Sequence, residues 1–278
     1  MSAGPPWIIF TDLDGTLLDG ETYRWDAAEE ALARLRAAHV PVVLCTSKTR
    51  APTERWRTAL RLGDPFVVEN GGAIYLPANY FPFTVPGARL RNSFQVIELG
   101  IPYEKLVGAL AEAATATGMV VRGFAQMSDA EVAALSGLEP RAAARARARE
   151  YDEAFLLETG EGEKQERFFA WLRQQGLRWV RGGRFWHLMG RNDKGMAVER
   201  LVGLYRQRDA AVRTVGLGDS PNDLDFLRVV DRPILVARPD GTYDEEVRRL
   251  VPRVKLAPGA GPVGWNAAVV ELLEQERL

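Results

Sequence analysis

An α/β fold is predicted, with a parallel sheet built from both ends of the chain and an α+β unit inserted between them. Three observations predict it. Short apolar segments alternate with helical patterns up to residue 72, the pattern changes between about 85 and 187, and the alternation returns after Gly190. Strands that alternate with helices favour a parallel sheet covered on both faces. We expect domains over residues 1–84, 85–189 and 190–278, of which the first and last form one core.

The first core segment predicts alternating strands and helices. Capping-box spacing between Asp26 and Glu29 precedes a helical pattern of apolar residues, and a second helix is expected over about 53–62, ending near Gly63. The last expected strand of this segment, at 66–70, is followed by a Gly-Gly turn. Three short apolar runs have the length of buried strands: 8–10, 40–46 and 66–70.

The middle segment has the mixed pattern of a separate unit. A helix over 102–117 ends at Gly118, and Ser128 with Glu131 opens a second helix that ends at Gly137. The other expected elements are a strand at 94–100, a strand at 151–158, a helix at about 163–175, and a hairpin at 177–190 with Gly182-Gly183 at its turn.

After Gly190 the alternation of the core returns. Ser220 and Pro221 suit the N-cap and first positions of a helix. The expected elements are a helix at 194–205, a strand at 212–219, the helix opened by Ser220, a strand at 233–237 and a helix at 263–276.

The composition excludes several classes of protein. With 278 residues, 46% of them hydrophobic, the chain can bury a sizeable core. Lys and Arg (36) nearly balance Asp and Glu (37), which argues against nucleic-acid or anionic-membrane partners. Cys45 is the single cysteine, the first residues lack the pattern of a signal peptide, and no apolar run is long enough to cross a bilayer. We therefore expect a cytoplasmic protein without an intramolecular disulfide, and predict no particular oligomeric state.

Two aspartates follow the first expected strand. Period two along an extended backbone puts Asp12 and Asp14 on the same side at the carboxyl end of that strand. Open parallel sheets bind ligands at this edge. Asp and Gly also form turns, and a turn explains Asp14-Gly15 about as well as a binding site does.

A second pair of aspartates ends the strand at 212–219. Asp219 stands at the strand end and Asp223 in the first helical turn, where helix capping alone explains a carboxylate. Four carboxylates at one sheet edge would repel one another unless a cation balances them. An all-oxygen cluster suits Mg²⁺ that is shared with a phosphate.

Hydroxyl and amine groups near the same edge suit a phosphate. Thr46 and Ser47 end the strand at 40–46, and Lys194 begins a helix that returns to the core. Each residue alone is weak evidence, because a strand-end hydroxyl is usually a cap and a lone lysine is usually solvated.

Together and in this order, these residues resemble the four motifs of the haloacid-dehalogenase-like phosphohydrolases: DLDGT (12–16), a strand ending in Thr46, Lys194 and GDSPND (218–223). The resemblance covers nearly the whole chain. It implies a Rossmannoid α/β core with a parallel sheet and an inserted α+β cap of type 2.

Within that family, the chain is similar to the mannosyl-3-phosphoglycerate phosphatases through "LCTSKTRAPTE", "ENGGAIY", "RAREYDEAF" and "GGRFWHLMGRNDKG". Related sugar phosphatases have Thr-Gly-Arg where this chain has Thr46-Ser47-Lys48. Either Thr46 or Ser47 can therefore contact the phosphoryl group, and alignment with the threonine of Thr-Gly-Arg favours Thr46.

The resemblance implies a role for each motif residue in removing phosphate from mannosyl-3-phosphoglycerate, a small phosphosugar. Asp12 attacks phosphorus to give an aspartyl-phosphate, and Asp14 protonates the leaving group and then activates water. Thr46 and Lys194 stabilise the phosphoryl oxygens. Mg²⁺ is the implied cofactor, held by Asp12, the main-chain carbonyl of Asp14, Asp219 and, through water, Asp223.

Substrate choice is expected to come from the cap and the loops facing it. A glycerate carboxylate favours Arg or Lys, and sugar hydroxyls favour carboxylates and amides. We interpret the arginine run at 141–149 as a solvated helix face. The candidate substrate-binding residues, each of which packing or surface exposure explains equally well, are Ser47, Lys48, Asn70, Arg149, Glu153, Arg184, His187 and Asn222.

Among other classes of protein, some lack these motifs and others share them. Cys45 and Arg50 have four residues between them, one fewer than a cysteine-phosphatase loop requires. A phosphatase acting on glucosyl-3-phosphoglycerate or sucrose-6-phosphate, one of Cof type, and a phosphomannomutase-like phosphotransferase share the motifs and stay open. The intact carboxylates and Lys194 argue against a non-catalytic phosphosugar-binding protein.

Overall fold

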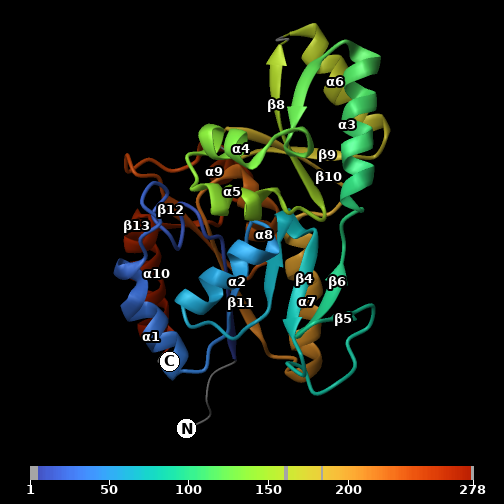
Figure 1. Ribbon diagram of the computed structural model, residues 1–278. Helices are drawn as coiled ribbons and strands as arrows, with labels where there is room; N and C mark the ends of the chain where they lie inside the picture. Colours follow the sequence, from blue (N-terminus) through green and yellow to red (C-terminus); the bar gives the residue numbers. More distant parts are fainter. Residues whose placement is uncertain (1–5, 160–161, 183, 277–278) are drawn as a thin grey trace.

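The computed structural model describes residues 6–159, 162–182 and 184–276, which form a larger α/β unit, the core, and a smaller α+β unit, the cap (Figure 1). The core contains both ends of the described chain, and the cap lies above it in the view of Figure 1. The chain passes from the core into the cap and back again. This arrangement confirms the predicted fold class.

The core is built on a nine-stranded sheet in the order β13-β12-β11-β1-β2-β3-β4-β6-β5. The six strands from β13 to β3 pair in parallel, and the other three extend the sheet with antiparallel pairs. In chain order the strands are β1 Trp7–Thr11, β2 Val42–Cys45, β3 Phe66–Val68, β4 Ala73–Pro77, β5 Arg89–Arg91, β6 Phe94–Glu98, β11 Arg213–Gly218, β12 Arg232–Ala237 and β13 Lys255–Ala260.

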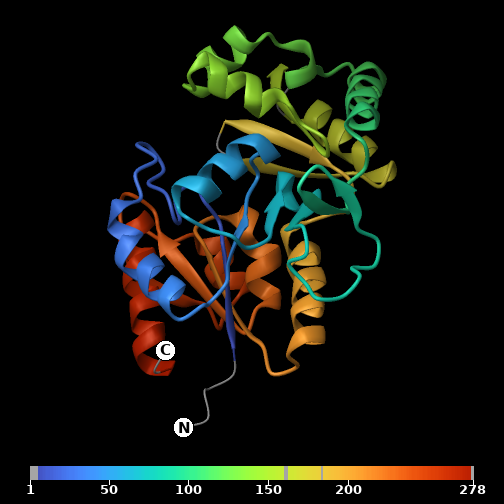
Figure 2. The ribbon, with the colours of Figure 1, turned by 60° about the horizontal axis from the view of Figure 1, so that its bottom comes forward.

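Helices cover both faces of this sheet (Figure 2). Side chains alternate along β1, so that Ile9 packs in one apolar cluster with α1 and α10, whereas Ile8 packs in another with α7, α8 and α9. Burial on both faces explains why the strands are apolar throughout. The core helices are α1 Glu29–Ala37, α2 Arg50–Ala59, α7 Lys194–Arg208, α8 Leu224–Val229, α9 Glu245–Leu250 and α10 Gly261–Glu276, with short 3-10 turns η1 Asp26–Ala28, η2 Glu69–Gly71 and η4 Pro221–Asp223.

The cap has a four-stranded antiparallel sheet in the order β7-β8-β10-β9. Its two faces are covered by different helices: Phe155 of β8 packs with α3 and α6, and its neighbour Ala154 packs with α4 and α5. The elements are α3 Tyr103–Thr117, β7 Val120–Gly123, η3 Phe124–Gln126, α4 Asp129–Ser136, α5 Pro140–Arg147, β8 Asp152–Thr159, α6 Glu163–Gln174, β9 Arg178–Gly182 and β10 Phe185–Met189.

The first boundary of the cap differs from the expected one at residue 85. β5 and β6 pair with each other, and β6 pairs with β4, so these strands extend the core sheet. Strand pairing therefore moves the boundary to the segment after Glu98. A strand at 94–98 has the same local pattern in either sheet, so the pattern alone does not assign it to one of them.

The predicted capping box and helix-ending glycines of the cap are present in the structure. The capping box predicted in the core is not. Ser128 and Glu131 form the predicted capping box, and Gly118 and Gly137 end their helices with positive φ. The capping box expected at Asp26 is absent, because this carboxylate accepts a hydrogen bond from Arg24 Nε at 3.0 Å instead. Of the hairpin turn, Gly183 lies outside the described residues.

Among the described residues, no helix combines the length and the apolar character that a membrane crossing requires.

Candidate active site at the carboxyl edge of the core sheet

The site begins where β1 ends, in the middle of the parallel sheet. Asp12 directly follows this strand and donates its backbone N–H to the carbonyl of Leu217 in β11 at 2.9 Å. Its side chain is nearly buried. The neighbours of β1 are β11 and β2, which come from opposite ends of the chain. Strand order therefore collects polar groups from distant segments at this edge, as in other open α/β sheets.

Lys194 lies buried between two of these carboxylates. Its Nζ is 2.7 Å from Asp12 Oδ1 and 2.7 Å from Asp223 Oδ1. Burial alone would lower the pKa of Lys194, but the two negative charges outweigh burial and raise it. Burial raises the pKa of Asp12 well above its usual range, and the charge of Lys194 offsets only part of that effect. The lysine thus stays charged and holds Asp12 in place.

Asp219 faces the same point from the end of β11. Thr16 donates its hydroxyl to Asp219 Oδ1 at 2.8 Å. A Cβ on Gly15, whose φ is +77°, would lie 2.9 Å from Asp219 Oδ2, so the glycine of the DLDGT motif makes room for this carboxylate. Burial, followed by the charge of Asp223, raises the pKa of Asp219 to about 7.

The carboxylates of Asp12, Asp219 and Asp223 suit a metal ion. One oxygen from each lies within 4.8 Å of the others. Asp223 also accepts the backbone N–H groups of Asp219 and Ser220, at 3.0 and 3.3 Å, so it caps the following turn as well. An all-oxygen donor set of this kind fits Mg²⁺. The capping and metal interpretations of Asp223 are therefore compatible.

Asp14 points to a different partner from Asp12. Lys48 Nζ lies 2.6 Å from Asp14 Oδ2, whereas Asp14 Oδ1 is buried without a hydrogen-bond partner. The Asp14 carboxylate does not belong to the group of three carboxylates that could hold a metal. Its side chain is therefore available for proton transfer.

Thr46 and Ser47 both lie at the end of β2. Thr46 is almost fully buried, and its Oγ1 accepts the N–H of Lys48 at 3.1 Å, which leaves its hydroxyl proton for another acceptor. Ser47 lines the adjacent cavity. The structure thus brings both hydroxyl groups to the sheet edge.

A cavity of about 530 Å³ lies between this edge of the core and the cap. Its core side includes Asp14, Ser47 and Lys48, and its cap side includes Arg149 and His187. A cavity of this size suits a small-molecule substrate. The remaining substrate-binding candidates, which do not line it, are Asn70, Glu153, Arg184 and Asn222.

Three of those remaining candidates have other contacts. Glu153 is buried and accepts a hydrogen bond from the Tyr103 hydroxyl at 2.6 Å and one from the backbone N–H of Ala125 at 3.1 Å. Arg184 is exposed and donates to the carbonyl of Leu135. Asn70 is buried and donates its Nδ2 to Asp152 Oδ2 at 2.8 Å. These positions match the packing alternative, which local pattern could not separate from substrate contact.

Asp152 is a buried residue that the sequence did not single out. It accepts hydrogen bonds from Asn70 Nδ2 at 2.8 Å and pairs with His187 Nδ1 at 2.9 Å and Arg149 Nη1 at 3.0 Å. Burial alone would raise the pKa of Asp152, but His187 and Arg149 outweigh burial and lower it. Asp152 thereby orients two residues that line the cavity. The sequence signal that could have identified Asp152 is the segment "RAREYDEAF", which contains it.

The arginine run in α5 is only partly a solvated face. Arg145 and Arg149 line the cavity, and Arg147 pairs with Asp129. Ala143 is buried in the cap. The expected solvated face is therefore wrong for Arg145 and Arg149, because this end of the run packs against α2 of the core.

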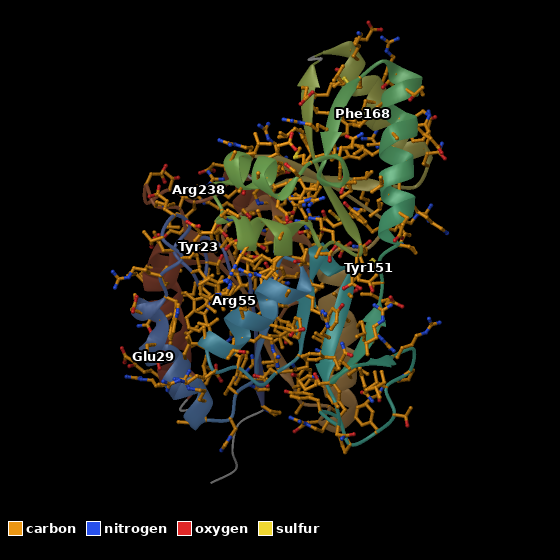
Figure 3. The ribbon with its side chains drawn as sticks, viewed as in Figure 1. Tyr23, Glu29, Arg55, Tyr151, Phe168 and Arg238 are labelled. Carbon is orange, nitrogen blue, oxygen red and sulfur yellow. The ribbon has the colours of Figure 1, made fainter. Side chains whose placement is uncertain are left out.

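Glu69 joins the cap to the core. Its carboxylate accepts the backbone N–H of Glu150 at 3.0 Å and of Tyr151 at 2.8 Å, and Figure 3 shows Tyr151 at the junction of the two units. Burial raises the pKa of Glu69 to about 7. These contacts, with the Thr49 hydroxyl donating to the carbonyl of Arg145 at 2.7 Å, hold the cap over the site.

Known proteins share the sequence and the fold. Residues 9–83 match a family model described as haloacid dehalogenase-like hydrolase. A glucosyl-3-phosphoglycerate/mannosyl-3-phosphoglycerate phosphatase of Methanococcoides burtonii is 44% identical over 96% of this chain and 97% of its own. A mannosyl-3-phosphoglycerate phosphatase of Pyrococcus furiosus is 36% identical over 82% of this chain and 90% of its own. A solved structure from Thermoplasma acidophilum shares the fold, with a TM-score of 0.67 and 17% identity over 98% of this chain and 99% of its own.

Proposed function

The chain belongs to the haloacid dehalogenase-like hydrolases, and we propose that it is a Mg²⁺-dependent phosphatase that converts mannosyl-3-phosphoglycerate to mannosylglycerate and orthophosphate. One observation carries the proposal: the buried Asp12, Lys194 and Asp223 cluster lies beside a cavity lined by the cations Lys48 and Arg149. The names of the two phosphatase relatives support the choice of substrate.

The first half of the reaction uses Asp12 and Asp14. A carboxylate oxygen of Asp12 attacks phosphorus, the bond from phosphorus to the glycerate oxygen breaks, and an aspartyl-phosphate forms. Asp14 gives its proton to the departing alkoxide. Lys194, 2.7 Å from Asp12 Oδ1, holds the nucleophile in place, and the Thr46 hydroxyl can donate to a phosphoryl oxygen.

The second half returns both aspartates to their starting state. Asp14, now ionised, takes a proton from water, and the oxygen of that water attacks the phosphorus of the aspartyl-phosphate. The bond between phosphorus and Asp12 breaks, which releases orthophosphate and restores the carboxylate. Splitting the displacement in this way replaces one difficult step with two easier ones.

Mg²⁺ would be held by Asp12, Asp219, Asp223 and the main-chain carbonyl of Asp14. When bound, it reduces the repulsion between the Asp12 carboxylate and a phosphate dianion. The three side chains converge closely enough for this role.

Cations in the cavity suit the second negative charge of the substrate. Besides its phosphate, mannosyl-3-phosphoglycerate carries a glycerate carboxylate. The Arg149 side chain is only 6% exposed, and its Nε is buried without a hydrogen-bond partner. Such a donor is costly to leave unpaired, by about 1 to 3 kcal/mol. We assign Arg149, with Lys48, to the carboxylate.

Phosphate release from a panel of phosphosugars tests the function. We expect the highest kcat/KM for mannosyl-3-phosphoglycerate, followed by glucosyl-3-phosphoglycerate, with sucrose-6-phosphate and mannose-6-phosphate lower by at least about 100-fold because they lack the carboxylate. A clear preference for either of the last two would reject the substrate assignment but not the phosphatase chemistry. Transfer of phosphate to another sugar, without free phosphate, would instead indicate a phosphotransferase.

Mg²⁺ is expected to raise the Tm more at about pH 8 than at about pH 6. Asp219 has a pKa of about 7 in the metal-free fold against 3.8 when unperturbed, so its contribution to stability is present at low pH and is lost as pH rises through 7. Metal binding needs the ionised carboxylate, so protons compete with Mg²⁺ below pH 7. Thermal unfolding with and without excess Mg²⁺ measures the two shifts.

The matched control for this experiment is Asp219→Asn, which should lose most of the Mg²⁺-induced shift at both pH values. A larger Mg²⁺ effect at pH 6 than at pH 8 in the unsubstituted protein would contradict the assignment of Asp219 as a ligand.

A further inference from the structure

The cavity also has an aromatic and apolar part of its lining that the proposed chemistry does not use. Tyr23 and Trp56 line it from the core, and Leu138 and Ala142 line it from the cap. The two aromatic rings are stacked, with centroids 6.4 Å apart and planes 24° apart. A phosphate and a carboxylate have no use for such a surface, so it suits a different part of the substrate.

Tyr23 is held toward the cavity by an unusual backbone. Its φ is +56°, a left-handed conformation that a bulky side chain adopts only when surrounding contacts enforce it. The loop supplies those contacts: Tyr23 donates its N–H to the Asp19 carbonyl at 3.0 Å, and the Asp19 carboxylate accepts the backbone N–H of Thr22 at 2.8 Å. The Asp19 loop thus fixes the position of the ring.

Starting at Asp14 in the reacting centre, a chain of contacts runs to Lys48, then to Tyr23 and then to Trp56. Lys48 Nζ lies 2.6 Å from Asp14 Oδ2 and also 5.1 Å from the centroid of the Tyr23 ring, and Trp56 stacks beyond Tyr23. In the proposed substrate, the phosphoester, the glycerate carboxylate and the sugar are joined through one three-carbon unit. The carboxylate is its first carbon, the sugar is borne by the oxygen of the second and the phosphate by the third, so the sugar and the carboxylate both lie within a few bonds of the phosphate. A cation and an aromatic surface side by side next to Asp14 can therefore meet the carboxylate and the sugar of one substrate molecule.

We propose that Tyr23 and Trp56 form a platform on which the sugar ring of the substrate packs, opposite Leu138 and Ala142 of the cap. This inference rests on the proposed function and deepens it. A pyranose ring has an apolar face of C–H groups that packs on aromatic rings, while its hydroxyl groups need polar partners at the edge. Arg55 lines the cavity beside this platform, and Figure 3 shows Tyr23 and Arg55 on the core below α4 and α5.

Trp56→Leu tests the platform, because leucine keeps apolar bulk but removes the ring. We expect KM for mannosyl-3-phosphoglycerate and the inhibition constant of mannosylglycerate each to rise about tenfold. The kcat and the inhibition constant of orthophosphate should change less than twofold, since the platform binds the sugar equally in ground and transition states. Trp56→Phe, which retains a ring, should restore most of the loss.

Trp171→Leu is the matched control, because Trp171 is a partly buried tryptophan of the cap helix α6 that does not line the cavity. It should leave all four constants near those of the unsubstituted protein. Unchanged mannosylglycerate inhibition in Trp56→Leu, or an equal change in orthophosphate inhibition, would overturn the platform while leaving the phosphatase intact. Failure of the unsubstituted protein to hydrolyse any glycosyl-3-phosphoglycerate would instead reject the proposed function.

Discussion

Asp12→Asn is expected to reduce phosphate release by at least about 10⁴-fold, because an amide cannot attack phosphorus as a carboxylate does. The fold should be retained. Lys194 donates to Asp12 Oδ1, and the asparagine side chain offers a carbonyl oxygen at the same position. Colorimetric phosphate release and far-UV circular dichroism on the same samples measure activity and fold together.

Asp240→Asn provides the control for that substitution, since Asp240 is an exposed aspartate of the core that contacts Thr242. It should keep the activity of the unsubstituted protein. Turnover by purified Asp12→Asn at the rate of the unsubstituted protein would show that the nucleophile has been assigned wrongly.

Lys194→Met should lower both activity and stability. The substitution keeps the length of the side chain but leaves the buried carboxylates of Asp12 and Asp223 without their cation. Breaking a buried ion pair from one side destabilises a protein by about 3 to 5 kcal/mol. The loss of a positioned cation beside the nucleophile should reduce kcat by roughly 10² to 10³-fold. Urea unfolding without metal and steady-state kinetics with Mg²⁺ provide the two measurements.

A double-mutant cycle distinguishes this mechanism from simple loss of packing. If repulsion among unpaired carboxylates causes the instability, adding Asp12→Asn to Lys194→Met should recover part of the lost free energy of unfolding. Additive effects of the two substitutions would show that Asp12 and Lys194 are not coupled.

Much of the fold and the reactive part of the site followed from local sequence. Asp12 and Asp219 were expected at strand ends because apolar runs stop there, and the structure places both at the carboxyl edge of adjacent parallel strands. Lys194 was expected at a helix start and is the first residue of α7. These predictions worked because strand period and helix capping depend on neighbouring residues alone.

Local pattern left some outcomes open, and contacts outside the local segment bear on them. Arg184 was a candidate for substrate contact, for which surface exposure was the alternative, and its guanidinium donates to the carbonyl of Leu135. The strand at 94–98 was assigned to the cap and pairs with β4 of the core. In each case the local pattern allowed two answers, and the contacts that bear on them lie outside the local segment.

The sequence by itself determined the α/β class, the residues that meet at the sheet edge and the chemistry they suit, because strand ends, caps and motif spacing are local properties. Only the tertiary structure decided which residues line the cavity. Tyr23 and Trp56 lie 33 positions apart and stack only because the Asp19 loop and α2 meet at one end of the cavity. Asp152 likewise contacts Asn70 of the core only through the way the two units are packed. Such contacts depend on how separate elements of the core pack and on how the two units meet, which no local pattern encodes.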